Sequence, residues 1–195
     1  MFPMKLSHSD YQERNAVQAA KDLLGKALVT HLDGIRTAGL ITETEAYMGV
    51  EDRASHAFGG RRTARNEAMY AAGGVAYVYL CYGIHHLFNV VVWKKNIPHA
   101  VLVRAIHPLE GQEAMLLRRG VKKLTTGGPG TLTQALGIRT AHNGEDLTGQ
   151  RIWIEHLGVK VPNKHIISGP RIGVDYAGED ALLPYRFRIA PSHLL

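Results

Sequence analysis

Apolar positions recur along the chain at two spacings, one typical of helices and one typical of strands. Val17, Ala20 and Leu24 share one helical stripe, which predicts a helix over residues 10–24 that ends at Gly25. Further helices are predicted at 66–72 with Asn66 as cap, at 108–119 with Pro108 as first residue and Gly120 as stop, and at 131–136. Strand-like runs predict strands at 27–32, 37–47, 100–106, 151–156, 165–174 and 185–189.

Residues 75–93 predict a β-hairpin, because two strand-like runs flank a turn near Gly83. The strands and helices do not follow the regular strand–helix–strand rhythm of a parallel sheet. No internal repeat or low-complexity linker divides the chain. We therefore predict an α+β fold: residues 1–195 form a single compact domain with a mixed, mostly antiparallel sheet, surrounding helices and a protruding β-hairpin.

The strand predicted at 37–47 carries unusual charge for a core element. Alternation places Ile41, Glu43, Glu45 and Tyr47 together on one face of this strand. The next 18 residues, 48–65, contain three glycines and no clear period, and long loops of this kind tend to be functional or disordered. Glu45, near the end of the strand, is placed to act as a general base, although most glutamates are surface residues in salt bridges.

Composition narrows the class of protein. The 195 residues hold 23 Lys and Arg against 17 Asp and Glu, a formal charge of +6, and no apolar stretch is long enough to cross a bilayer. Residues 1–15 lack the apolar block of a secretion signal, so we expect a cytoplasmic protein, nucleoid-associated if bacterial, with no membrane partner. The single cysteine, Cys81, excludes an internal disulfide and a cysteine-rich zinc site.

Basic residues gather in three groups that are well separated along the chain. The groups are Arg53, Arg61, Arg62 and Arg65; Lys94 and Lys95; and Arg118, Arg119, Lys122 and Lys123. Such groups can bind a polyanion by neutralising its phosphates, or they can be no more than solvated surface charge. Net charge alone leaves both interpretations open.

Tyrosines concentrate in the predicted hairpin region, where Tyr70, Tyr77, Tyr79 and Tyr82 fall within 13 residues. Tyrosine favours strands, so a core role is the ordinary one, but Tyr82 lies beside Gly83 at the expected turn. A ring at a projecting tip can slide between base pairs, and rings in a pocket can stack on an extruded base. Asn89 and Arg104 lie in otherwise apolar strands, so each needs polar partners or a ligand.

Two further patterns suggest other chemistry. Five potential metal ligands fall within 14 positions: Glu43, Glu45, Glu51, Asp52 and His56. Such a set would suit magnesium or manganese in a nuclease, although no recognised ligand spacing is present. The glycine loop of residues 125–130 leads into a helix and could hold an anion, but it lacks the lysine of a nucleotide-binding P-loop. A turn or packing role for this loop also stays open.

Several motifs together resemble a known family. They are ITETEAYMGVEDRASHAFGGRRTARN, YVYLCYGIHHLFNVVV, VLVRAIHPLEG, GGPGTLTQALGI and RIGVDYAGEDALLPYRF. In order and spacing, from Asp22 to Phe187, they resemble the alkyladenine (3-methyladenine) DNA glycosylases of the mammalian type. The resemblance implies a base-excision repair enzyme that flips a damaged purine from duplex DNA and hydrolyses its N-glycosidic bond.

The resemblance also implies roles for individual residues. Glu45 would activate the attacking water, with Arg104 near it and near the flipped nucleotide. Tyr47, His56 and Tyr79 would form the walls of the base pocket, and Asn89 would discourage guanine through its 2-amino group. The remaining roles concern DNA: intercalation by Tyr82 and backbone contacts by Arg61 and Arg65.

No metal or other cofactor is expected, and the partner is double-stranded DNA containing damaged purines, bound by a monomer. Because no lysine occurs in the ETEAY segment or in the tyrosine hairpin, a Schiff-base lyase step is not indicated, and the product would be an abasic site. Two alternatives stay open. One is a metal-dependent nuclease that uses Glu43, Glu45 and His56, and the other is a minor-groove DNA-binding module without chemistry.

Overall fold

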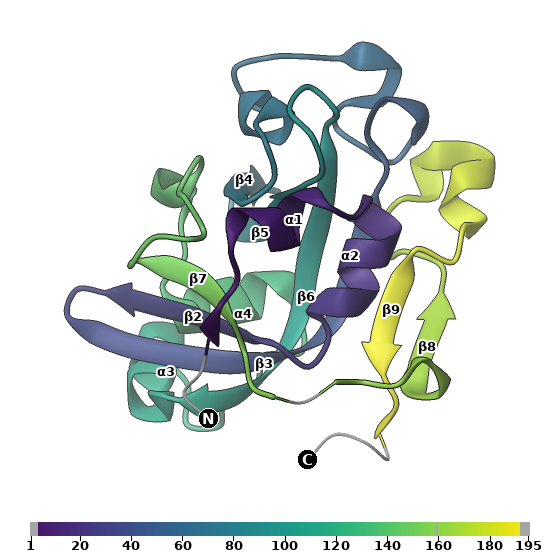
Figure 1. Ribbon diagram of the computed structural model, residues 1–195. Coiled ribbons are helices and arrows are strands. Elements are labelled where there is room, and N and C mark those ends of the chain that lie inside the picture. The colour runs from purple at the N-terminus through teal and green to yellow at the C-terminus, as the bar shows by residue number, and fades with distance from the viewer. Residues whose placement is uncertain (1–3, 159, 192–195) are drawn as a thin grey trace.

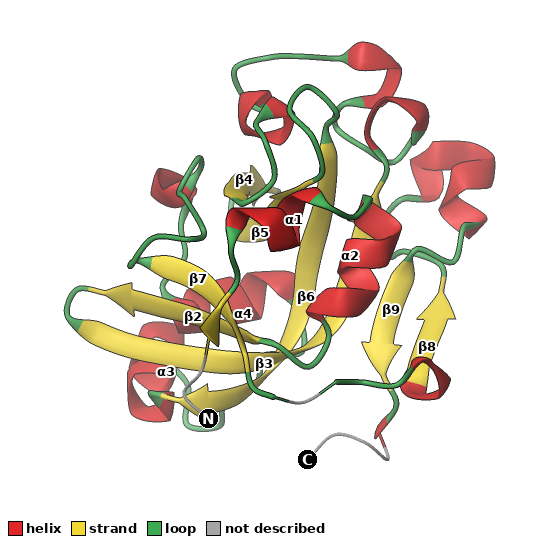
Figure 2. Cartoon of the chain, viewed as in Figure 1, coloured by secondary structure: helices red, strands yellow, loops and turns green. Residues whose placement is uncertain are grey.

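A strongly curled sheet of nine strands organises the computed structural model, which describes residues 4–158 and 160–191 (Figures 1 and 2). The strands are β1 (Met4–Lys5), β2 (Ala27–Leu32), β3 (Ile35–Tyr47), β4 (Val75–Cys81), β5 (His85–Val92), β6 (His99–Glu110), β7 (Ile152–His156), β8 (Ile166–Gly169) and β9 (Arg186–Ile189). The α-helices are α1 (His8–Gln12), α2 (Ala16–Leu23), α3 (Gln112–Arg119) and α4 (Pro129–Leu136). No helix in this described part of the chain is long and apolar enough to span a membrane.

The strands follow the order β1-β7-β2-β3-β6-β5-β4, and β9 pairs with β3 and with β8. Each of these neighbouring pairs is antiparallel. The predicted α+β class with a mostly antiparallel sheet is therefore confirmed. The β4–β5 hairpin lies at one edge of the sheet and ends in an exposed turn, where Tyr82 and Gly83 both have positive φ angles of 50° and 73°.

Alternation along the strands separates a core face from a second face of the sheet. Val78 of β4, Val90 of β5 and Val103 of β6 belong to the main hydrophobic cluster, which also includes residues of the four helices. Their strand neighbours Tyr77 and Val91 belong instead to a second, smaller cluster. Because successive side chains of a strand point to opposite faces, the tyrosines of β4 share the second face with alternate residues of β5 and β6.

The predicted alternation of β3 is wrong at one point. The pairing of β3 with β6 shifts register between Ile41 and Glu43. A one-residue shift turns the following side chains to the other face, so Ile41 is buried in the main core with Ala46 instead of lying beside Glu43 and Glu45. On the core side, Thr44 Oγ1 donates to the backbone oxygen of Ala20 in α2, which leaves Glu45 on the second face.

The predicted first helix is two helices. Asn15 has an extended backbone, and its side chain accepts a hydrogen bond from Gln18 N at 3.0 Å, so it caps α2 and interrupts the 10–24 run. The predicted start at Pro108 is also wrong, because β6 continues to Glu110 and α3 begins only after Gly111. Pro108 lies beyond the part of β6 that pairs with β5, where a missing N–H removes no bond to that strand. Gly120 ends α3 as predicted.

The predicted helix at 66–72 is a short 3-10 segment, Glu67–Tyr70. Asn66 holds the predicted N-cap position, but its side chain makes no capping hydrogen bond. The buried Asn66 side chain instead accepts from Thr63 N and donates to the carbonyls of His56 and Arg61, which fixes the long loop after β3. The predicted strands at 151–156 and 185–189 are confirmed to within one residue, as β7 and β9. The strand predicted at 165–174 is shorter, because β8 ends at Gly169 and the chain turns into the next loop.

Candidate active site

A pocket of about 580 Å³ opens on the second face of the sheet. Its walls come from the end of β3, the loop after β3, the β4–β5 hairpin, β6 and the loop before β9. In Figure 1 the blue loops that follow β3 and the yellow segment that precedes β9 lie at the same end of the molecule. The polar and aromatic side chains that line the pocket are Tyr47, His56, Arg65, Tyr77, Tyr79, Tyr82, Asn89, Arg104 and Tyr176.

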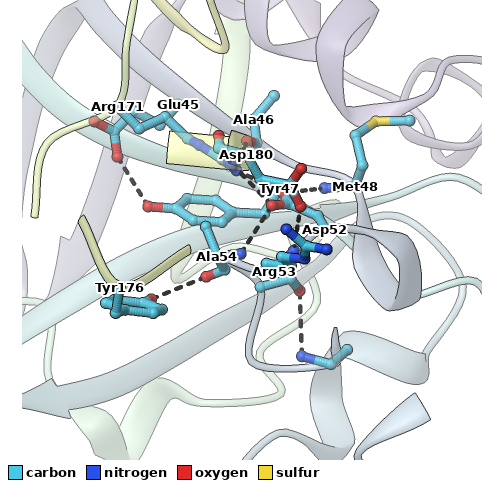
Figure 3. A network of polar contacts seen from close by, with 12 residues as sticks. Glu45, Ala46, Tyr47, Met48, Asp52, Arg53, Ala54, Arg171, Tyr176 and Asp180 are labelled. Atoms are coloured by element: carbon cyan, nitrogen blue, oxygen red, sulfur yellow. Dashed lines mark hydrogen bonds and ion pairs between the residues drawn. The ribbon is translucent and has the colours of Figure 1, made fainter. Parts of the chain in front are cut away.

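The carboxylate of Glu45 lies directly behind this pocket wall, with 0% of the residue exposed. Tyr47 Oη donates to Glu45 Oε2 at 2.9 Å, as Figure 3 shows. Ile172 N donates to Oε1 at 2.8 Å, and Arg104 Nη1 lies 3.3 Å from the same oxygen. Because Tyr47, Arg104 and Ile172 all line the pocket, the carboxylate is one contact away from anything the pocket holds.

Burial sets the electrostatics of Glu45. It raises the pKa of the Glu45 carboxyl, and the raise is opposed by the positive charge of Arg104 and by the hydrogen bonds from Ile172 and Tyr47. Burial, with the adjacent Glu45 charge, also raises the pKa of Tyr47, so its hydroxyl stays a proton donor. Glu43 shares Arg104 with Glu45, because Glu43 Oε1 lies 3.2 Å from Arg104 Nε. The same oxygen lies 3.3 Å from Arg186 Nη1.

Aromatic rings form the opposite wall. The ring of His56 lies edge-on to Tyr79 with centroids 4.7 Å apart, and its Nδ1 is 2.8 Å from Tyr77 Oη. Burial lowers the pKa of His56, with smaller contributions from Arg65 and Arg61, so the imidazole is neutral near pH 7. Burial also favours the neutral form of Tyr77, whose pKa it raises to about 12. The wall is therefore aromatic and uncharged.

Asn89 lies on β5 directly opposite Tyr77 and is buried at the pocket floor. Its Nδ2 donates to the Tyr77 carbonyl at 3.1 Å, which fixes the amide in place. Of the two arginines predicted near the DNA backbone, Arg65 lines the pocket and extends over the Tyr79 ring at 5.6 Å. Arg61 does not line the pocket, and its exposed side chain lies on the loop after β3.

Tyr82 stands on the rim of the pocket with 89% of its surface exposed. A φ of 50° places it in the left-handed region, which is uncommon for residues other than glycine. Cys81, the single cysteine, is half-buried in the pocket wall beside it. The hairpin thus presents a large ring to solvent at the mouth of the pocket.

The loop before β9 supplies groups that the sequence did not single out. Ile172 contributes only its backbone N–H. Tyr176 donates its hydroxyl to the Ala54 carbonyl at 3.1 Å (Figure 3). Arg171 and Asp52 form a buried ion pair behind Tyr47. A backbone donor leaves no trace in side-chain patterns, and only the resemblance of the segment RIGVDYAGED drew attention to this loop.

The five carboxylate and histidine residues considered as metal ligands do not assemble. Asp52 pairs with Arg171, Glu43 and Glu45 share Arg104, and His56 faces the tyrosines. Within residues 4–158 and 160–191, no three His, Cys, Asp or Glu side chains are grouped so that they could hold a metal ion.

A second hollow, of about 740 Å³, lies along the other side of the hairpin turn. Ile84 and the neighbouring histidines form one of its walls, and α4 forms another. Its charged and titratable lining residues are His31, Asp33, His85, His86, Arg118, Arg139, His142 and Arg151, a set that we call the His/Arg groove. Arg151 pairs with Glu145, whereas the exposed Arg139 forms no ion pair with any residue that the structure describes.

The glycine loop before α4 serves packing. A Cβ atom on Gly130 would come within 2.8 Å of the His85 ring, so the absence of a side chain lets α4 approach the hairpin. The N–H of Gly128 already donates to Thr131 Oγ1. This occupied amide favours the turn and packing interpretation of the loop over the anion-binding one.

Comparisons with known proteins agree on one family. The family model described as methylpurine-DNA glycosylase matches residues 10–193. A Chlamydia abortus protein named "Putative 3-methyladenine DNA glycosylase" is 48% identical over 93% of this chain and 96% of its own. Relatives of the same name from Clostridium acetobutylicum and Bacillus cytotoxicus are each 44% identical, over 95% and 91% of this chain and 94% and 92% of their own. These relatives are bacterial, so the comparisons support the resemblance as to family but not as to its mammalian type.

Proposed function

The chain belongs to the methylpurine-DNA glycosylase family, and on this premise we propose that it is a monofunctional 3-methyladenine DNA glycosylase of base-excision repair. It flips an alkylated or deaminated purine out of duplex DNA and hydrolyses the N-glycosidic bond, which leaves an abasic site. The substrate class comprises 3-methyladenine, 7-methylguanine, hypoxanthine and ethenoadenine. The observation that carries the proposal is a buried carboxylate, Glu45, directly behind the wall of an aromatic pocket beside an exposed tyrosine.

Glu45 is the general base. As the bond between C1′ and the purine nitrogen breaks, its electron pair leaves with the base and positive charge develops on the sugar. Glu45 stabilises this charge and takes the proton of the water that adds to C1′. For a water to reach the carboxylate, one contact must open toward the pocket, and the Arg104 contact at 3.3 Å is the longest of the three.

The pocket suits an electron-poor base. Each tyrosine face favours a cationic alkylated purine by about 0.5 to 2 kcal/mol. The neutral His56 ring adds no repulsion to such a cation, whereas an imidazolium would. Tyr47, His56 and Tyr79 hold the base between them, and the anchored Asn89 amide meets its edge, where it disfavours normal guanine through its 2-amino group. Ring fit and this edge contact supply the discrimination that cation binding alone lacks.

Tyr82 enters the duplex as the base leaves. An exposed ring on a tight turn can fill the gap in the stack, which lowers the cost of holding the nucleotide in the pocket. Arg61 and Arg65 contact the phosphates next to the flipped nucleotide, and the enzyme acts as a monomer on double-stranded DNA.

The test is base release from duplexes that carry hypoxanthine, ethenoadenine or 3-methyladenine, each measured with and without excess EDTA. Wild type is expected to release base under both conditions, and Glu45→Gln is expected to lose release by at least about 100-fold, the lower range for removal of a general base. Glu155→Gln is the matched control, because Glu155 is also a buried carboxylate paired with an arginine, but at the β2–β7 end of the sheet.

Three outcomes would count against the proposal. Strand cleavage that EDTA abolishes would favour the metal-dependent nuclease. Tight binding of damaged duplex without base release by wild type would favour the minor-groove DNA-binding module. Equal release by wild type and Glu45→Gln would remove the general-base role.

A further inference from the structure

Arg171 and Asp52 form the most completely buried ion pair of the described residues, with 0% and 1% of their side chains exposed. Arg171 Nη1 and Nη2 donate to the two Asp52 oxygens at 2.5 and 2.8 Å. The guanidinium also donates to the carbonyls of Ala46, at 2.9 Å, and Asp180, at 3.1 Å. One side chain thus connects β3, the loop after it and the loop before β9, as Figure 3 shows.

Both neutral donors to Glu45 are attached to this pair. The guanidinium of Arg171 lies over the Tyr47 ring, 4.9 Å from its centroid, and the hydroxyl of that ring donates to Glu45 Oε2. The next residue in the chain is Ile172, whose N–H donates to Oε1. Asp52 in turn accepts hydrogen bonds from Met48 N and Ala54 N, so its own position is fixed by the loop.

We propose that Asp52 and Arg171 are positioning residues for the proposed base excision, acting through Tyr47 and Ile172 to orient the Glu45 carboxylate for proton transfer. The inference rests on the proposed role of Glu45. Neither residue of the pair forms a hydrogen bond or ion pair with Glu45, and Arg171 does not line the pocket, so apart from the charge of Arg171 they act on the reaction through these two donors.

Stability alone is a weak explanation for this pair. Taking two charges out of water costs several kcal/mol for each ion, and well-packed apolar residues of similar volume often serve as well or better. Arg171 Nε is buried and has no hydrogen-bond partner among the described residues, which adds a further cost. A pair that is costly in this way is better explained by the geometry it imposes on its neighbours.

The pair should also influence the titration of Glu45. The charged or titratable groups that face Glu45 from the surrounding elements are Glu43, Tyr47, Tyr79, Arg104 and Arg171. Without Asp52, Arg171 loses its anchor, and the Tyr47 and Ile172 donors lose their fixed direction toward the carboxylate. Fewer hydrogen bonds to the charged form of Glu45 raise its pKa, so the acid limb of the rate profile should move to higher pH.

The experiment is single-turnover base release at saturating enzyme, measured against pH for Asp52→Asn and Arg171→Lys. Asp52→Asn keeps the shape of the side chain and removes its charge, and Arg171→Lys keeps the charge and removes the two-pronged contact. Both should slow release by about 10- to 100-fold, the effect of a small misplacement of a catalytic group. Both should also shift the acid limb upward, with affinity for damaged duplex unchanged.

Glu155→Gln is the matched control for loss of a buried, arginine-paired carboxylate, and it should lower the melting temperature without moving the pH profile. A Tyr47→Phe background gives a second readout, because Asp52→Asn should cost less there than in wild type if it acts through the tyrosine. The inference is overturned if both variants merely melt earlier and keep the wild-type rate and pH profile. It is equally overturned if the losses add fully to that of Tyr47→Phe. Base release by Glu45→Gln at the wild-type rate would instead remove the proposed function itself.

Discussion

Glu45 combines the tightest burial in the site with a charge that the proposed reaction requires. Its pKa is raised in the folded protein, chiefly by burial, relative to the ordinary value of 4.5. A carboxyl with a raised folded pKa binds its proton more firmly when folded, so its contribution to stability is full below pH 4.5 and is lost as the pH rises through the folded pKa. The folded protein is thus less stable with Glu45 ionised, the form that the proposed chemistry needs, than with Glu45 protonated.

This argument gives a prediction for Glu45→Gln, which cannot ionise. The free energy of unfolding of wild type, minus that of the variant, should fall as the pH rises above about 4.5, by about 1.4 kcal/mol for each unit by which the pKa is raised. Urea titrations of both proteins between about pH 4 and pH 8 measure it. A difference that stays flat, or that rises with pH, would contradict the burial argument.

Much of the site could be predicted residue by residue, because several of its polar side chains lie within strands that are otherwise apolar. Glu45 on a half-apolar strand, and Asn89 and Arg104 among valines and leucines, are conspicuous in the sequence. The structure brings these three to one pocket and its wall. Ile172 could not be found in this way, because its contribution is a backbone N–H whose direction depends on a contact 127 positions away.

At the scale of elements, the turn of the β4–β5 hairpin carries a residue, Tyr82, that the stability of the hairpin does not require. The turn needs positive φ at residue 82, and glycine would adopt φ 50° without the cost of about 1 to 2 kcal/mol that a side chain bears there. Glycine also loses more freedom on folding, by about 0.5 to 1 kcal/mol, which offsets about half of that gain. A tyrosine at this position is therefore not explained by the stability of the hairpin.

We accordingly expect Tyr82→Gly to fold with an unchanged or slightly raised melting temperature and to bind damaged duplex more weakly by about 1 to 3 kcal/mol, the worth of one aromatic ring stacked on a base. Base release should slow as well. Fluorescence anisotropy with an abasic-analogue duplex and thermal melting measure the two quantities. Leu117→Ala on α3 removes a similarly exposed apolar side chain, 83% exposed, and should change neither. Undiminished binding by Tyr82→Gly would exclude intercalation.

Strands and helices with a uniform apolar periodicity are predicted well from the sequence. Errors occur where a single residue ends or interrupts the backbone geometry of an element. The pattern of residues 10–24 is helical throughout, yet the Asn15 side chain bonds to Gln18 N and breaks it. A proline at 108 is typical of a helix start, but β6 can hold it because β5 pairs no further along. Cap and edge effects of this kind depend on neighbours that periodicity does not specify.

For the molecule as a whole, the hairpin turn lies between two hollows of different character. The pocket is mainly aromatic, with only Arg65 and Arg104 as charged lining residues, whereas the His/Arg groove holds three arginines and four histidines against one aspartate. The basic groups of the sequence divide accordingly, since Arg65 lines the pocket and Arg118 lines the groove. If Tyr82 enters a duplex, the two backbones pass on opposite sides of the turn, and the groove is positioned to meet the strand that keeps its bases.

Arg139 tests this arrangement, because it is the exposed arginine of the groove without an ion pair among the described residues. Arg139→Gln should weaken duplex binding and lower the slope of log Kd against log salt by about one, the change expected for loss of one phosphate contact. Release from a single-stranded substrate should stay at the wild-type rate, since only the second strand loses a contact. Lys160→Gln removes the same charge from a different hollow, beside α1 and α2, and should leave the slope unchanged. Equal slopes for wild type and Arg139→Gln would mean that the groove meets no phosphate, with base excision in the pocket unaffected by that result.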